Sequence, residues 1–224
     1  MMPSGPGFVF DLDGTLVDSV YQHVVTWTEA LREAGIEMAA WKVHRRVGMS
    51  GGLLTQELVR EAGRQLHVSQ LRQIQERHAE LYRDQLHTVR PLPGAIEILQ
   101  LLTRKQVPWS IATSGRRATA EPALDLLSLS DDAIVVTHEE VTHAKPDPDL
   151  FLEAVSRMGV TREELVIVGD SVWDLLAARR ARALGIAVLS GGYGREELEA
   201  AGAYRVYDDP AALLAHLDEV GVRT

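Results

Sequence analysis

The chain has 224 residues, of which 46% are hydrophobic and 25% are charged, and its formal net charge is -9 at pH 7. This composition is typical of a globular protein with a substantial core, and no apolar run approaches the ~18 residues of a membrane span. The negative charge argues against general nucleic-acid binding, and the absence of cysteine excludes disulfides and thiolate chemistry. The first residues have neither the basic region nor the apolar segment of a secretory signal, so we expect a cytoplasmic protein without membrane partners.

A short apolar run near the start of the chain leads directly into two closely spaced aspartates. Phe8, Val9 and Phe10 are predicted to form a buried strand, and Asp11 and Asp13 follow at once. Aspartate is disfavoured inside strands, and burying a lone carboxylate is costly. The placement therefore indicates that these carboxylates have a function.

The next part of the chain is predicted to be entirely helical. Ser19 is a typical N-cap for a first helix that ends before Gly35. Three further helices are predicted in this region, at residues 39–47, 53–62 and 68–86. The sequence RPLPG at residues 90–94 then breaks the helical pattern and is expected to be a hinge or linker.

Beyond this linker, predicted helices and strands alternate. The helices are expected at residues 95–105, 118–127, 148–158, 172–183 and 211–217. The strands are expected at residues 109–113, 133–136, 165–168, 186–189 and 204–206. Such alternation is typical of a parallel sheet with helices on both faces. Because the first strand belongs to the same sheet, we predict a doubly wound α/β core, residues 1–16 and 91–224, with an inserted all-helical cap, residues 17–90.

Polar residues follow four of the predicted strands: first Asp11 and Asp13, then Thr113, Ser114 and Gly115, then Lys145, and finally Asp170 and Asp174. Ligands of an open parallel sheet bind beyond the carboxyl ends of its strands. A turn or a helix cap would explain each of these residues taken alone. Their joint position at one edge of the sheet indicates an active site.

Phosphoryl transfer through an aspartate is the chemistry that needs this set. A carboxylate can attack phosphorus and form an aspartyl-phosphate, and we assign that role to Asp11. Several carboxylates in one site call for a cation, and oxygen ligands without histidine or cysteine favour Mg²⁺. Asp13 is then free to act as general acid and base. Thr113, the two residues after it and Lys145 are predicted to bind the phosphoryl oxygens.

These motifs resemble those of the haloacid dehalogenase superfamily of hydrolases, in the phosphoglycolate phosphatase and beta-phosphoglucomutase-like branch with a helical cap. The resemblance is most specific in the first and fourth motifs, DLDGTL at residues 11–16 and GDSVWD at residues 169–174. Thr113 and Lys145 match the second and third motifs. The likeness covers nearly the whole chain, including the position and length of the insert.

The resemblance implies a Mg²⁺-dependent phosphatase that acts on a small phosphorylated metabolite. We expect a monomer or a homodimer. It also implies that Mg²⁺ is bound by the side chains of Asp11 and Asp170 and by the main-chain carbonyl of Asp13, with Asp174 assisting. A sugar-phosphate mutase would use the same core residues and would differ in how the cap admits water. A phosphoacceptor switch module would present similar residues but needs no helical insert, and sustained turnover would exclude it.

The insert contains one cluster of cations, in KVHRRVGMSGG at residues 42–52. At least one of Arg45 and Arg46 is predicted to contact an anionic or polyhydroxyl leaving group, because the glycines after them would let the loop move over the site. A solvated helix end explains the same arginines equally well, since cations favour the C-terminal end of a helix. No role is assigned to the three histidines near the site segments, His23, His138 and His143.

Overall fold

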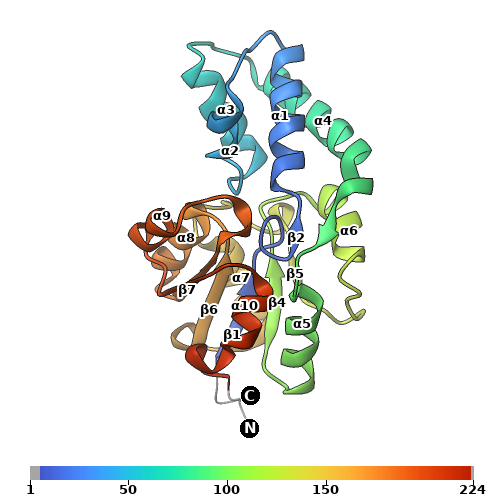
Figure 1. The fold of residues 1–224 in the computed structure, drawn as a ribbon. Helices are drawn as coiled ribbons and strands as arrows, with labels where there is room; N and C mark the ends of the chain where they lie inside the picture. Colours follow the sequence, from blue (N-terminus) through green and yellow to red (C-terminus); the bar gives the residue numbers. More distant parts are fainter. Residues whose placement is uncertain (1–5, 223–224) are drawn as a thin grey trace.

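A six-stranded parallel sheet forms the centre of the protein in the computed structural model, which describes residues 6–222 (Figure 1). The ends of the predicted core, residues 1–5 and 223–224, lie outside the described residues. The strands are β1 (Gly7–Phe10), β4 (Trp109–Ala112), β5 (Val135–Val136), β6 (Leu165–Gly169), β7 (Leu184–Val188) and β8 (Arg205–Tyr207). Their order is β5-β4-β1-β6-β7-β8, with every pair parallel, so the predicted doubly wound class is confirmed.

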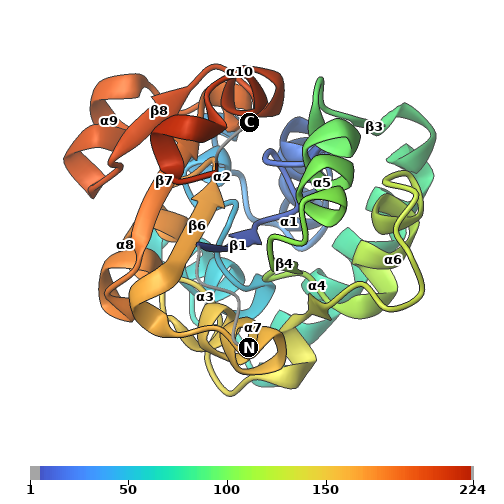
Figure 2. The same ribbon diagram turned by 90° about the horizontal axis from the view of Figure 1, so that it is seen from below.

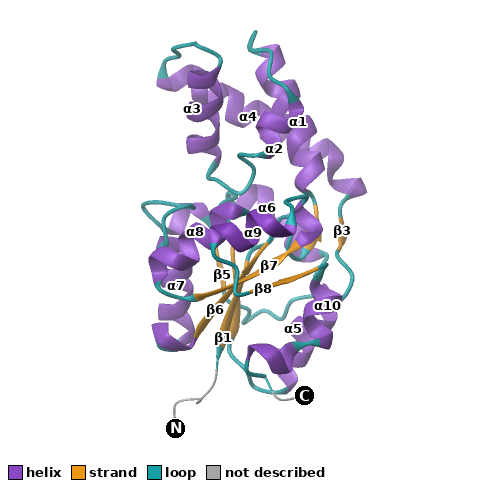
Figure 3. Cartoon of the chain, turned by 60° about the vertical axis from the view of Figure 1, so that its left-hand side comes forward, coloured by secondary structure: helices purple, strands orange, loops and turns teal. Residues whose placement is uncertain are grey.

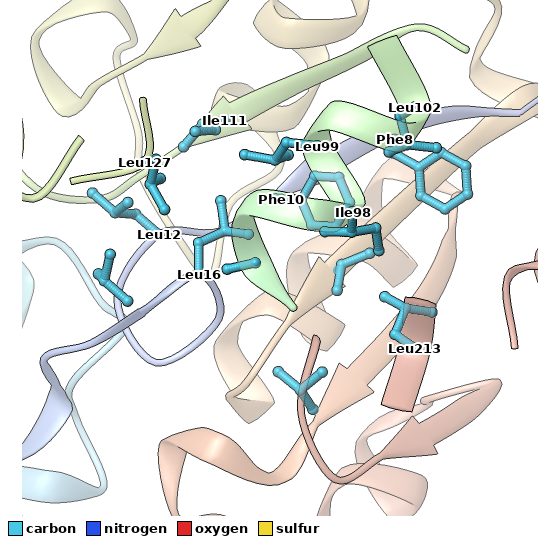
Figure 4. Close-up of a cluster of buried hydrophobic side chains, with 14 of the residues drawn as sticks. Phe8, Phe10, Leu12, Leu16, Ile98, Leu99, Leu102, Ile111, Leu127 and Leu213 are labelled. Carbon is cyan, nitrogen blue, oxygen red and sulfur yellow. The ribbon is translucent and has the colours of Figure 1, made fainter. Parts of the chain in front are cut away.

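Alternate side chains of β1 pack on opposite faces of this sheet. Phe8 and Phe10 pack on one face, covered by α5 (Ala95–Arg104), α6 (Arg117–Asp125) and α10 (Pro210–Ala215), as the close-up in Figure 4 shows for part of this cluster. Val9 packs on the other face, against α7 (Asp149–Met158) and α8 (Val172–Ala181). Figure 2 shows the two helical layers on either side of the strands. Because both faces are covered, the strands are buried and the carboxyl edge is left for ligands.

Four helices lie beyond the carboxyl edge of the sheet (Figures 1 and 3). They are α1 (Val20–Glu33), α2 (Ala40–His44), α3 (Gly51–Glu61) and α4 (Val68–Gln85). They share a hydrophobic cluster of their own, which includes Trp27, Leu31, Leu54 and Leu58. This separate cluster supports the division into a core, residues 1–16 and 91–224, and a cap, residues 17–90, which we keep as a proposal.

The chain enters and leaves this helical insert through a two-stranded antiparallel ladder that the sequence analysis missed. In it, β2 (Val17–Asp18) pairs with β3 (Arg90–Pro91), so part of the predicted linker is a strand. Helix α9 (Arg195–Ala201) was also missed, and only one of its residues, Leu198, is buried. Short 3-10 helices complete the fold: Leu86–Thr88, His138–Glu140, Arg162–Glu164, Leu189–Gly191 and Leu217–Val220. Within residues 6–222, no helix has the length and apolar character required to cross a membrane.

Candidate active site

Three buried aspartates lie together at the carboxyl edge of the sheet. Asp11 directly follows β1, Asp170 directly follows β6, and Asp174 lies in the first turn of α8. One carboxylate oxygen from each lies within 4.8 Å of the others, and no residue of the three is more than 4% exposed. Because β1 and β6 are neighbours in register, the sheet itself brings these three side chains together.

Lys145 supplies one positive charge to this acidic cluster. Its Nζ lies 2.5 Å from Asp11 Oδ1 and 2.8 Å from Asp174 Oδ1, and its side chain is fully buried. Burial alone would lower the pKa of Lys145, but the two carboxylates outweigh that effect and raise it. One lysine against three carboxylates leaves the site with a negative charge when all of them are ionised.

The electrostatics of the acidic cluster fit a hard divalent cation. Burial raises the pKa of Asp11 to about 7, with Lys145 opposing the rise and Asp174 adding to it. Burial, followed by repulsion from Asp174 and Asp11, raises the pKa of Asp170 well above its ordinary value. A cation bound between these oxygens would favour their ionised forms. An all-oxygen donor set of this kind fits Mg²⁺.

Asp170 is enclosed by the first motif, through Gly14 and Thr15, and by Gly191 near the end of the sheet. Thr15 Oγ1 donates a hydrogen bond of 3.2 Å to Asp170 Oδ1. Gly14 has a φ of +80°, and a Cβ there would lie 2.6 Å from Asp170 Oδ2. A Cβ on Gly191 would lie only 1.7 Å from the same oxygen. The glycine in the first motif is therefore required both by its backbone conformation and by the carboxylate beside it.

Asp13 stands apart from the acidic cluster and is held by residues of the insert. Its Oδ1 accepts a hydrogen bond of 2.6 Å from Ser19 Oγ and lies 3.2 Å from His23 Nε2. Burial raises the pKa of Asp13, but His23 and Ser19 outweigh burial and the net effect lowers it. The sequence analysis gave His23 no role. The spacing from Ser19 to His23, one turn of α1, was the signal that could have found it.

Thr113 and Ser114 follow β4 and lie beside the same site. Both are buried, and Thr113 Oγ1 accepts a hydrogen bond of 2.9 Å from the Gly115 N–H. The hydroxyl of Ser114 is buried without a hydrogen-bond partner among the described residues. This hydroxyl lines the cavity, so it is free to pair with a water molecule or a ligand oxygen there.

A cavity of about 390 Å³ lies between the sheet edge and the insert. The core contributes predicted site residues to its lining: Asp11, Asp13, Thr113, Ser114, Gly115 and Lys145. The insert contributes mainly aromatic, apolar and histidine side chains, among them Trp27, Leu54, His78 and Tyr82. Asp170 and Asp174 belong to the acidic cluster but not to this lining. The cavity thus places the predicted nucleophile and acid/base opposite a wall that can contact a leaving group.

Neither Arg45 nor Arg46 is among the described residues that line the cavity. A side-chain nitrogen of Arg45 lies 2.7 Å from Glu197 Oε1, and one of Arg46 lies 2.6 Å from Glu61 Oε2. The carbonyl of Arg45 also accepts a hydrogen bond of 3.1 Å from Trp173 Nε1 in the core. The predicted contact of these arginines with the leaving group stays a prediction, because it requires an ion pair to break first.

Alanine substitutions test that contact. If either arginine binds the leaving group, Arg45→Ala or Arg46→Ala should raise KM for the preferred metabolite roughly ten-fold or more, because a charge-assisted hydrogen bond of about 1.5–3 kcal/mol is lost. Hydrolysis of p-nitrophenyl phosphate should hardly change. Equal effects on both substrates, or no effect on either, would show that the arginines act only through their ion pairs with glutamate.

Comparison with known proteins places this site in a family. Residues 6–182 match the model of the haloacid dehalogenase-like hydrolases. The chain belongs to this family. It is 31% identical to hexitol phosphatase A of Escherichia coli over 185 residues, covering 81% of this chain and 82% of that one. It is also 31% identical to phosphoglycolate phosphatase of Rhodospirillum rubrum over 216 residues, covering 92% and 88%.

A solved structure agrees with this placement. A hydrolase from Pseudomonas syringae is 48% identical, with a TM-score of 0.94 over 97% of this chain and 100% of that chain. The predicted superfamily, its likeness to phosphoglycolate phosphatases and an enzyme of the phosphatase type are confirmed. The roles assigned to single residues of this haloacid dehalogenase-like hydrolase stay predictions.

Proposed function

We propose that the protein is a Mg²⁺-dependent phosphatase that hydrolyses a small phosphorylated metabolite through an aspartyl-phosphate on Asp11. The observation that carries this proposal is the position of Asp11. Its carboxylate lines a cavity large enough for a metabolite, contacts Lys145 and belongs to the acidic cluster. The phosphatase names of the two relatives described above support the same reaction class.

The acidic cluster would hold the metal. Asp11 and Asp170 are its proposed side-chain ligands, with Asp174 assisting and the main-chain carbonyl of Asp13 as a further ligand taken from the resemblance. Bound Mg²⁺ would neutralise negative charge on the phosphoryl oxygens and between the carboxylates. Asp174 has less freedom than the other two, because Lys145 and the Ser171 hydroxyl, at 2.5 Å, already contact its oxygens.

The proposed reaction has two displacements at phosphorus. In the first, the Asp11 carboxylate forms a bond to phosphorus while the bond from phosphorus to the leaving oxygen breaks, and Asp13, which must carry a proton when this step begins, gives it to that oxygen. In the second, Asp13 takes a proton from water, which attacks the phosphorus and releases inorganic phosphate and the Asp11 carboxylate. Lys145, through its contact with Asp11 Oδ1, orients the nucleophile. Thr113 and Ser114 hold the phosphoryl oxygens.

Release of inorganic phosphate tests this proposal. The purified protein should hydrolyse p-nitrophenyl phosphate and at least one member of a panel of phosphorylated metabolites in Mg²⁺. Excess EDTA should abolish this activity and added Mg²⁺ should restore it, because the acidic cluster needs a hard cation. Full activity in the chelator would contradict the metal site.

Isomerised sugar phosphate without released phosphate would identify the mutase instead. Location in the cytoplasm and a monomeric or dimeric state are kept as proposals.

A further inference from the structure

Two histidines extend from Asp13 into the helical insert as one hydrogen-bonded chain. Asp13 Oδ1 lies 3.2 Å from His23 Nε2, and His23 Nδ1 lies 3.1 Å from His78 Nε2. His23 belongs to α1 and His78 to α4, so the chain joins two helices that are far apart in sequence. His78 also lines the cavity. None of the proposed catalytic steps uses His78.

Aromatic neighbours fix both imidazole rings. The His78 ring is stacked on Trp27, with 3.8 Å between the ring centroids and 8° between their planes. The His23 ring is stacked on Tyr82, with a separation of 3.9 Å and an angle of 11°. Only 7% of His78 is exposed. Stacking fixes the plane of each ring, and the hydrogen bonds fix which edge of the ring carries nitrogen toward its partner.

The two contacts of Asp13 fall on the same oxygen. Ser19 Oγ and His23 Nε2 both contact Oδ1, whereas no described residue forms a hydrogen bond with Oδ2. A carboxyl group anchored through one oxygen keeps the other oxygen available to carry the proton that the leaving group takes up. Burial, followed by the nearby His23, holds the pKa of His78 well below its ordinary value, so the His78 ring is neutral at pH 7. A neutral imidazole has one donor and one acceptor nitrogen. When His23 donates from Nε2 to the Asp13 carboxylate, its Nδ1 is the acceptor, and His78 donates to it from Nε2.

We propose that His78 is a positioning residue, which holds His23 so that Asp13 presents Oδ2 to the oxygen of the leaving group. This inference rests on the proposed function, because it assumes that Asp13 is the general acid. Without the bond from His78, the His23 ring keeps its plane against Tyr82 but loses the contact that fixes which way its nitrogen atoms point. Asp13 then keeps Ser19 as its only fixed donor and turns more freely. The consequence is poorer proton delivery, with the acidic cluster and the nucleophile unchanged.

Substrates whose leaving groups differ in acidity distinguish a positioning role of His78 from a role in packing alone. An alkyl alcohol is a poor leaving group and needs a proton as its bond to phosphorus breaks, whereas p-nitrophenolate leaves without one. The ratio kcat/KM reports the steps up to release of the alcohol, so slow hydrolysis of the aspartyl-phosphate does not affect it. Loss of positioning should therefore lower kcat/KM for an alkyl phosphate more than for an aryl phosphate. Damage to packing should lower both alike.

Three variants at residue 78 form a matched set, tested with glycerol 2-phosphate and p-nitrophenyl phosphate in Mg²⁺. His78→Phe keeps a ring that stacks on Trp27 but removes the bonding nitrogen. His78→Gln places an amide nitrogen near the position of Nε2, whereas the amide of His78→Asn is too short to reach it. We expect His78→Phe and His78→Asn to lower kcat/KM for the alkyl ester roughly ten-fold or more, part of the 10²–10⁴ that general acids contribute. The aryl ester should change less than about two-fold, and His78→Gln should recover the alkyl activity.

His87→Phe serves as the control, because His87 is exposed and is not among the residues that line the cavity. It should leave both ratios as they are in the wild-type protein. Equal losses on both esters in His78→Phe, no loss on either, or a His78→Gln variant no better than His78→Phe would overturn the positioning role. Failure of the wild-type protein to hydrolyse either ester would instead count against the proposed function, so the two failures are distinguishable.

Discussion

Replacing Asp11 by asparagine is expected to lower kcat for p-nitrophenyl phosphate at least about a thousand-fold, to the background rate. Asparagine has nearly the size of aspartate but lacks the negative charge that attacks phosphorus. The substitution removes one carboxylate from a crowded acidic cluster, so the fold should persist. Steady-state kinetics in Mg²⁺ measure the effect, and a thermal unfolding curve of the same preparation establishes that the variant is folded.

Asp18→Asn is the matched control for this substitution. Asp18 is an exposed aspartate in β2, a few residues after Asp11, and it does not line the cavity. Its loss should change kcat by less than about two-fold, since surface substitutions away from a site have small effects. If Asp11→Asn kept a tenth of the wild-type activity, the aspartyl-phosphate mechanism would be wrong.

The second large effect is expected in stability. Lys145→Met should lower the free energy of unfolding by about 3–5 kcal/mol at pH 8 in metal-free buffer, because it leaves buried carboxylates without their cationic partner. Urea unfolding with and without Mg²⁺ measures the effect. Added Mg²⁺ should return part of the loss, since it binds the folded protein through the same carboxylates. Lys42→Met is the control: Lys42 makes a partly exposed ion pair of 2.7 Å with Glu61, and its loss should cost less than about 1 kcal/mol.

The loss of folding stability caused by Lys145→Met should be larger at high pH than at low pH. Burial raises the pKa of Asp11 in the folded protein from 3.8 to about 7, so folding favours its protonated form. Removing Lys145 takes away the group that opposes this rise. Without metal, stability therefore falls as the pH increases from the ordinary pKa of the carboxyl through its folded value. The variant should lose less stability at pH 5 than at pH 8. Equal losses at both pH values, or losses equal to those of Lys42→Met, would contradict this account.

The acidic cluster could be predicted because its residues follow parallel strands, and the order of those strands in the sheet fixes where the residues lie. Once Phe8–Phe10 and residues 165–168 are recognised as neighbouring buried strands, the aspartates after them must meet at one edge. Lys145 was predicted by the same reasoning, as a loop residue after a strand. These inferences needed only the pattern of apolar runs and the chemistry of the residues that end them.

The contacts within the helical insert could not be predicted in this way. Whether His23 faces His78 depends on how α1 packs against α4, and helical periodicity gives the faces of each helix but not their partners. The ion pair of Arg46 with Glu61 of α3 depends on other packing within the insert. The ion pair of Arg45 with Glu197 of α9 depends on how the insert sits against the core. The two-residue strands β2 and β3 were missed because so short a segment has no period to detect.

The ladder of β2 and β3 has a consequence for how such an enzyme can change its specificity. Val17 lies opposite Pro91 and Asp18 opposite Arg90, so the chain enters and leaves the insert through two adjacent paired segments. A different helical segment spliced between these strands would leave the sheet and its acidic cluster intact. The hydrogen bonds from Ser19 and His23 to Asp13 restrict that modularity. A transplanted segment must bring its own anchor for the acid/base, and chimeras that lack one should bind new phosphate esters yet release their alcohols slowly.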